Sequence, residues 1–162
     1  MQIRRFTEAD ADAVSELIVR TMRTSNAADY PEELLARVIE RQRPEDVRFR
    51  ASWTHFYVAE EAGQIIGCGA IGPYWGSETE SSLFSFFVDP TVQRRGVGRA
   101  IMETLETDEY FLRAERVEIP ASITGLPFYL AMGYTYKNGI AEPDEERLFR
   151  LEKNRKTEKK FF

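Results

Sequence analysis

The sequence has very few of the residues that build covalent or metal-held frameworks. Its 162 residues include one cysteine, Cys68, and one histidine, His55. A single cysteine cannot form a disulfide within the chain, which is typical of proteins of the reducing cytoplasm. A zinc site made of cysteine and histidine ligands is also excluded, because it needs more such residues than the chain has. We therefore expect a protein that holds no metal and is stabilised by an ordinary apolar core.

Long apolar runs and an excess of positive charge are also missing. No stretch approaches the roughly 18 consecutive apolar residues of a membrane-spanning helix, and residues 1–8 lack the apolar run of a signal peptide. Lys and Arg number 22 against 27 Asp and Glu, so the formal net charge is −5. Nucleic-acid-binding domains usually present a basic face. We expect a cytoplasmic protein that binds neither membranes nor nucleic acid.

Nothing in the sequence divides the chain into two domains. It has no internal repeat and no linker rich in Pro, Gly or Ser, and 162 residues is a common length for one domain. We expect a single domain over residues 1–152, followed by a charged tail over residues 153–162. The tail ends in Phe161 and Phe162, which could dock on a second copy of the chain and form a homodimer.

The N-terminal third has one strand pattern followed by two helix patterns. Residues 2–6 alternate polar and apolar side chains, which predicts a short strand. Thr7 and Asp10 form a capping pair ahead of apolar residues at helical spacing. Pro31 stands at a favourable first position of a second helix, which Pro44 ends or kinks. The residues that follow Pro44 have no clear period.

The rest of the chain has short strand patterns separated by two helix patterns. The segments with strand patterns are 55–60, 65–71, 81–88, 117–119, 134–137 and 148–151. Helices are predicted from Gly98 onward and from Thr124 to Gly133, a residue type that often ends helices. Strands and helices in this mixed order predict an α/β (α+β) fold with one central sheet.

The segment with the most chemical information joins the strand pattern at 81–88 to the helix that begins near Gly98. It contains two glycines and three arginines: Gly96, Gly98, Arg94, Arg95 and Arg99. Helix N-termini present unpaired N–H groups, and glycines let the backbone approach an anion, so the segment predicts a phosphate site. It is not a dinucleotide motif, because Ile101 stands at the third glycine position, nor a P-loop, which needs Gly-Lys-Ser/Thr. A tight turn with surface arginines that bind nothing is the alternative.

Four blocks of the sequence stand in the order and spacing of a known family. They are Gln93-Arg94-Arg95-Gly96-Val97-Gly98, Phe56 to Glu60 with Gly63 to Gly67, Phe87 to Pro90, and Phe128 to Tyr134. With these blocks the chain resembles the GNAT superfamily of acyl-CoA-dependent N-acetyltransferases. The resemblance implies a mixed central sheet of about 6–7 strands, flanked by about 4 helices, with strands splayed at the cofactor site.

The resemblance also implies roles for individual residues. Backbone N–H groups of the loop would hold the pyrophosphate of acetyl-CoA, the co-substrate: Arg94, Arg95, Gly96, Val97, Gly98 and Arg99. Backbone groups of Phe86 and Val88 would pair with the pantetheine arm, and the Val88 N–H would polarise the thioester carbonyl. Tyr129 falls on the tyrosine that protonates the departing thiolate, and Ser122 falls on a polar position near the pantetheine. For Tyr129, simple packing on the sheet is the alternative.

No general base can be assigned from the sequence. Some family members have a glutamate eleven residues before the first residue of the loop, but that position here is Ser82. Glu80 and Glu78 lie just upstream and could act through a water, although solvated loop carboxylates are the simpler interpretation. The missing base keeps a second hypothesis open, a CoA-binding sensor or regulatory module without catalysis. A phosphate-binding domain unrelated to CoA is a third.

The expected reaction is direct transfer of the acetyl group to a primary amine. The acceptor could be a small molecule, a protein N-terminus or a lysine, and the acidic balance slightly favours a cationic one. Tyr74 and Trp75 either wall the acceptor pocket or pack locally. Cys68 is expected to be buried and not to carry an acyl group, and His55 is expected to have no catalytic role.

Overall fold

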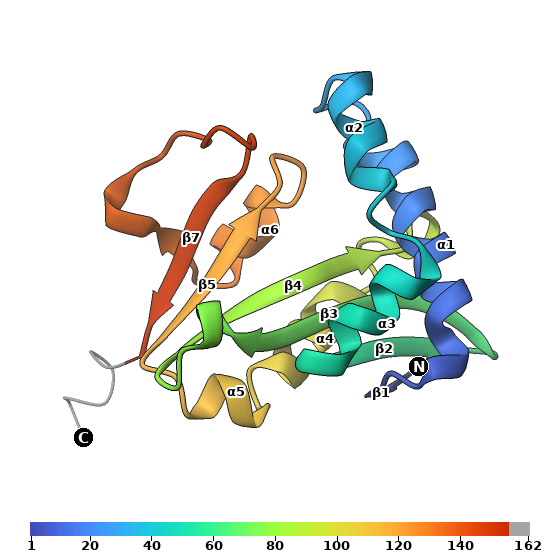
Figure 1. Cartoon of the computed structure of the whole chain (residues 1–162), viewed down its shortest axis with the longest axis horizontal. Coiled ribbons are helices and arrows are strands. Elements are labelled where there is room, and N and C mark those ends of the chain that lie inside the picture. Colours follow the sequence, from blue (N-terminus) through green and yellow to red (C-terminus); the bar gives the residue numbers. More distant parts are fainter. Residues whose placement is uncertain (156–162) are drawn as a thin grey trace.

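The chain folds around one mixed sheet (Figure 1). The computed structural model describes residues 1–155. In this part of the chain the sheet has seven strands in the order β1-β2-β3-β4-β5-β7-β6, antiparallel except for the parallel pair β4–β5. The strands are β1 (Gln2–Arg5), β2 (His55–Glu61), β3 (Gln64–Pro73), β4 (Glu80–Val88), β5 (Arg116–Ala121), β6 (Thr135–Tyr136) and β7 (Phe149–Asn154). The predicted fold class is confirmed.

Helices cover both faces of the sheet. Within the described residues they are α1 (Ala11–Thr21), α2 (Glu32–Ile39), α3 (Pro44–Trp53), α4 (Val97–Leu105), α5 (Glu109–Leu112) and α6 (Leu126–Ala131). The α1–α3 face holds the buried side chains of Cys68 and Ala70, and α4 packs on the opposite face over Gly67 and Gly69. A Cβ on Gly67 would lie 2.8 Å from Ile101 of α4, so glycine at this position lets the helix approach the strand closely.

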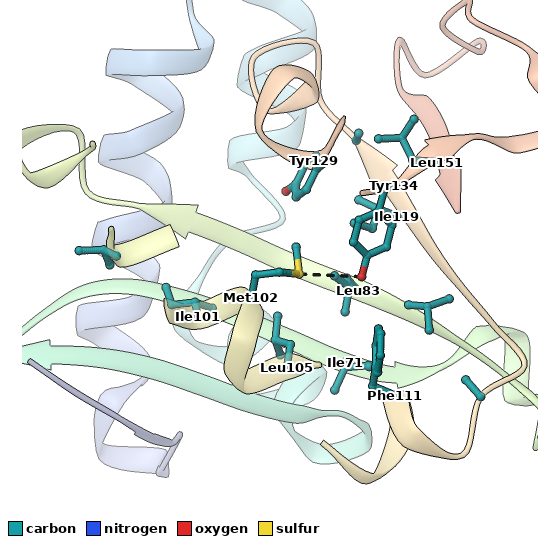
Figure 2. Close-up of a cluster of buried hydrophobic side chains, with 14 of the residues drawn as sticks. Ile71, Leu83, Ile101, Met102, Leu105, Phe111, Ile119, Tyr129, Tyr134 and Leu151 are labelled. Carbon is teal, nitrogen blue, oxygen red and sulfur yellow. Dashed lines mark hydrogen bonds between the residues drawn. The ribbon is translucent and has the colours of Figure 1, made fainter. Parts of the chain in front are cut away.

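The apolar face of α4 fixes the helix against the sheet. Ile101, Met102 and Leu105 are fully buried and pack in one cluster with Leu83 of β4 and Ile119 of β5 (Figure 2). These three α4 residues have the helical spacing of an amphipathic stripe. Because α4 follows β4 after one loop, this packing also fixes the N-terminus of α4 beside the end of β4.

The two parallel strands separate after a short paired stretch. Glu80, Ser81 and Ser82 pair with residues 116–118 of β5, and no β4–β5 pairing continues beyond Ser82 in the described chain. Figure 1 shows β4 and β5 diverging toward the side where α1 and α6 lie. The predicted splay is therefore present, and the paired and separated stretches are called the closed end and the open end below.

Two helices differ from the sequence prediction. Pro44 neither ends nor kinks a helix: α2 ends at Ile39, and Pro44 is the first residue of α3. Proline is favoured there because its missing N–H would have no partner in the first turn. Only Val47 of α3 is fully buried, which explains why the segment shows no apolar stripe. With α3 and the short α5, the described chain has six α-helices where about four were expected.

The last strand extends slightly beyond the predicted end of the domain. β7 runs to Asn154, whereas the sequence placed the domain boundary after residue 152. Residues 156–162, with the two phenylalanines expected to dock on a second copy, lie outside the described residues. No helix in residues 1–155 is long and apolar enough to cross a membrane.

Candidate active site

A cavity of about 620 Å³ opens where β4 and β5 separate. Residues 83–87 of β4 and Ile119 and Pro120 of β5 line one side of it. Side chains from the segment 22–42 line the other side, together with Arg50 of α3 and residues 145–148 ahead of β7. Most of these side chains are apolar, as in small-molecule sites generally.

The open end of β4 has a free edge and a bulge. Beyond Ser82 the β4 edge that faces β5 has no strand partner among residues 1–155. On its other edge, Ser85 and Phe86 both stand opposite Gly69 of β3, and Ser85 has a φ of 51°. A bulge of this kind breaks the ladder locally and changes the direction of side chains. Phe86 and Val88, the residues predicted to pair with pantetheine, lie in this stretch.

The two glycines of the loop are needed for different reasons. Gly96 has a φ of 84° as the residue before α4, a conformation that strains other residues, and an added Cβ would meet nothing within 4 Å. A Cβ on Gly98 would lie 3.4 Å from the Phe128 ring of α6 and 3.6 Å from Val88. Gly96 thus permits the turn, and Gly98 permits close packing between α4, α6 and the end of β4.

The three arginines of the loop have different surroundings. Arg95 forms an ion pair with Glu61 at the end of β2, with an N–O distance of 3.0 Å. Arg94 and Arg99 are exposed and form no ion pair with a described residue. The Val97 side chain is buried in the core, so only its backbone can contact a ligand. The loop therefore leaves two guanidinium groups and the N-terminus of α4 available to an anion.

Tyr129 lies on α6 and faces the cavity. The helix begins at Leu126 with Pro127 in its first turn, as predicted. The Tyr129 ring packs against Phe86 and Phe128, with centroid distances of 5.7 and 5.6 Å, and Figure 2 shows it projecting from α6 toward β4. Burial raises the pKa of its phenol well above the ordinary value. Its hydroxyl has no partner among residues 1–155, and the residue lines the cavity.

Ser122 and Tyr30 line the cavity, and each forms a hydrogen bond with the turn that precedes α6. The Ser122 hydroxyl accepts a hydrogen bond from the Gly125 N–H at 2.9 Å, so it supports the turn into α6 while lining the cavity. The Tyr30 hydroxyl accepts a hydrogen bond from the Ile123 N–H at 2.8 Å. Sequence analysis did not anticipate Tyr30, because no local pattern indicates a contact between residues 93 positions apart.

The carboxylates considered as bases lie at the closed end. Glu80 forms an ion pair with Arg116 at 2.9 Å, and that hydrogen bond holds the Glu80 pKa below its usual value. Neither Glu80 nor Glu78 lines the cavity, and the Ser82 hydroxyl donates to the Glu118 carbonyl. The carboxylates that do line it are the exposed Glu145 and Glu146, which the sequence did not single out.

Three other residues for which the sequence analysis discussed a functional role lie apart from the cavity. Tyr74 packs locally, with the Arg116 guanidinium 4.9 Å from the centroid of the Tyr74 ring. Its neighbour Trp75 is exposed, so it neither packs in the core nor lines the cavity. His55 bonds to Asp108, the residue that caps α5. None of these side chains lines the cavity.

Cys68 is buried, as expected. Burial raises the pKa of its thiol to about 12, and the thiol donates to the Ser85 carbonyl at 3.1 Å. A thiol that stays protonated is a poor nucleophile, so Cys68 acts here as a packed core residue.

Comparisons with known proteins agree with this geometry. Residues 52–136 match the model of a family described as an acetyltransferase (GNAT) domain, and a search of curated proteins found no match. The PaiA N-acetyltransferase from Thermoplasma acidophilum, solved in complex with coenzyme A, is similar over 94% of this chain and 98% of its own, with 18% identity and a TM-score of 0.78. A GNAT family acetyltransferase from Brucella melitensis, solved in complex with acetyl-CoA, is similar over 83% and 82%, with 20% identity and a TM-score of 0.61. These structural likenesses show a shared fold, and the family model covers more than half of the sequence. The chain belongs to the GNAT family of acetyltransferases.

Proposed function

We propose that this GNAT domain is an enzyme that transfers the acetyl group of acetyl-CoA directly to a primary amine. One observation carries the proposal: the N-terminus of α4, the free edge of β4 and the cavity adjoin one another. Gly98 of α4 lies against Val88, and Phe86 of the same strand contacts Tyr129. The relatives from T. acidophilum and B. melitensis hold coenzyme A and acetyl-CoA.

The loop would bind the pyrophosphate of acetyl-CoA. The N–H groups of Val97, Gly98 and Arg99 open α4 and have no acceptor within the helix. Gly96 in its left-handed conformation turns the chain into this N-terminus. Arg94 and Arg99 would add charge-assisted hydrogen bonds to the anion, whereas Arg95 is held by Glu61.

The open end of β4 would hold the rest of the co-substrate. A pantetheine arm contains amide groups, so it can pair with the free edge at Phe86 and Val88 as an added strand does. A backbone N–H at this edge would stabilise negative charge that develops on the thioester oxygen. The pantetheine arm can pair with β4 only because β4 and β5 separate here. A β5 strand paired with β4 along its full length would cover this edge.

Bound acetyl-CoA supplies an activated thioester to the acceptor amine. Tyr129 would donate its proton to the sulfur that departs. A phenol is protonated at neutral pH, and the residue lines the cavity with no hydrogen bond from its hydroxyl to a described residue. An attacking ammonium must lose its proton first, and water that enters the cavity can accept it.

Thermal unfolding and an acetyl-transfer assay test the proposal. Acetyl-CoA at about 100 times its dissociation constant is expected to raise the melting temperature by roughly 5–10 °C, with ATP as the control ligand. The protein should then release free CoA from acetyl-CoA faster with at least one amine of a mixed panel than with water alone as the acceptor. Absence of both effects would contradict the proposal.

One observation favours a second function, a CoA-binding module without catalysis. Among the described residues that line the cavity, the only carboxylates are exposed. Such a module would show the same melting shift with acetyl-CoA but no acetyl transfer to any amine, so the two measurements together separate the two functions.

A further inference from the structure

Arg50 extends from α3 to the bulge of β4. Its Nη1 donates to the Ser85 hydroxyl at 2.8 Å and to Gln42 Oε1 at 3.2 Å, and its Nη2 donates to the Arg41 carbonyl at 3.3 Å. Arg50 lines the cavity at the bulge of β4, the strand along which the pantetheine arm and the thioester are proposed to lie. An anion held by this guanidinium would therefore be a near neighbour of the reacting carbonyl.

Part of the guanidinium is available to a ligand. Arginine has five N–H donors, and the three contacts above use only Nη1 and Nη2. Nε donates to no described residue. It is not fully buried, so solvent reaches it. Nε and Nη2 of an arginine can bind the two oxygens of one carboxylate.

No carboxylate of the described chain pairs with Arg50. Asp46, one helical turn earlier on α3, pairs with Arg43 instead at 3.2 Å. Glu145 and Glu146 line the same cavity but form no ion pair with it. Burial lowers the pKa of Arg50, which reflects the cost of partly desolvating this charge. A cation kept at such a cost in a ligand cavity is suited to an anionic ligand.

The other side chains that line the cavity indicate which class of anion could bind there. Among the described residues that line the cavity, Arg50 is the one cation that is not exposed, because Arg37 and Arg41 are both exposed. The guanidinium fork fits the two oxygens of a carboxylate, and its single positive charge balances one carboxylate. Around it the cavity is lined by apolar side chains: Met22, Leu34, Leu35, Val38, Leu83, Phe84, Phe86, Phe87, Ile119 and Leu148.

We propose that the acceptor is an amino acid with an apolar side chain, whose carboxylate is bound by Arg50 while its amine faces the thioester. This rests on the proposed acetyl transfer and names its acceptor class. It departs from the cationic acceptor that the net charge favours. Net charge sums the whole surface, whereas the acceptor meets the charges that line one cavity.

Pairs of acceptors with and without the carboxylate test the inference. Each of leucine, methionine, phenylalanine and tryptophan is compared with its decarboxylated amine and with its α-amide. The amine pKa values of these two references lie on either side of that of the amino acid, so a preference over both cannot come from protonation. For at least one side chain, the amino acid is expected to have a kcat/KM at least tenfold higher than either reference.

Variants of α3 then connect that preference to Arg50. Arg50→Met keeps an apolar chain of similar reach but no donor, and should reduce the preference to below about twofold. Arg50→Lys should retain part of it. Arg48→Met, an exposed position on the same helix, should leave it unchanged. If Arg50→Met fails to fold, the acceptor pairs with the native chain and with Arg50→Lys still decide the question.

The outcomes separate this inference from the proposed function. A melting shift with acetyl-CoA and equal transfer to amines and amino acids would overturn the inference and leave the function standing. A melting shift with no transfer to any member of the set would also overturn the inference. No melting shift would contradict the proposed function itself, and the inference with it. A carboxylate preference that persists in Arg50→Met would show that another group recognises the anion.

Discussion

A half-buried arginine lies at each end of the β4–β5 pair, and the two have opposite surroundings. At the closed end, Arg116 contacts three carboxylates, those of Glu80, Glu118 and Glu152, at 2.9, 2.9 and 3.2 Å. At the open end, Arg50 contacts a hydroxyl, an amide oxygen and a carbonyl but no carboxylate of the described chain.

The difference shows where the fold pairs its own charged groups and where polar groups face a cavity instead. Buried charges are costly unless they are paired. At the closed end the strands hydrogen-bond and the charges pair, so that end contributes to the structure of the sheet. At the open end a strand edge, a phenol and a guanidinium all face one cavity.

The largest expected effect is at the loop beside the open end. Gly96→Glu should reduce acetyl-CoA affinity more than 100-fold, because it places a negative charge at the anion site and strains a φ of 84°. Isothermal titration of acetyl-CoA measures this. Gly63→Glu, at an exposed glycine with a similar φ of 80°, is the matched control. Equal affinities in the two variants would refute the loop as the pyrophosphate site.

The closed end should respond in stability instead. Glu118→Ala removes a buried carboxylate that pairs with Arg116 and Lys137, and should lower the free energy of unfolding by about 3 kcal/mol. Urea unfolding measures the loss, and Glu115→Ala, at an exposed position, is the control. The folded Glu118→Ala protein should bind acetyl-CoA normally, and a large loss of affinity would mean that the two ends are not separate in function.

Tyr129→Phe tests the phenol at the open end. Loss of a general acid should lower kcat about 100-fold, while acetyl-CoA affinity changes less than about twofold. Steady-state kinetics and titration give the two values. Tyr134→Phe also removes a buried hydroxyl, one that contacts Glu106 rather than the cavity, and it should leave kcat unchanged. Native kcat in Tyr129→Phe would assign proton donation to water.

The smallest effect is the response of the closed end to acid. Arg116 holds the pKa of Glu80 below its usual value in the folded protein. The ion pair therefore stabilises the folded protein at pH values above the pKa of Glu80 in the unfolded chain. This stabilisation is lost as the pH falls through the pKa of Glu80 in the folded protein. Because Glu80 is partly exposed, the contribution should be about 1 kcal/mol or less.

Urea unfolding of the native chain and of Glu80→Gln gives the test of this contribution. The native chain should be more stable at pH 7, and the difference should shrink below about pH 4.5. A difference that is independent of pH would exclude this ion pair as its source.

Local patterns predicted the parts of the site that depend on neighbouring residues. The turn at Gly96 and the helix that carries Tyr129 need only short-range geometry and apolar spacing, and both are present. The separation of the strands at the site followed from the resemblance to the family and is also present.

Contacts between distant segments were not predictable in this way. Counting back from the loop gives Ser82, and Glu80 and Glu78 just upstream of it were considered as bases, but strand pairing puts this segment at the closed end. Arg50 was missed because α3 has no apolar stripe to identify it as a helix, and because its contact with Ser85 spans 35 positions.

The sequence by itself determined a family, a sheet with its helices, and a glycine turn suited to an anion. The family followed from the resemblance of four sequence blocks, whereas the strands, helices and turn depend on hydrophobic period, caps and backbone freedom, which act over a few residues. Only the tertiary structure decided which charged groups are paired with each other and which face the cavity. That assignment depends on where β4 and β5 stop pairing, and it follows from packing across the whole sheet.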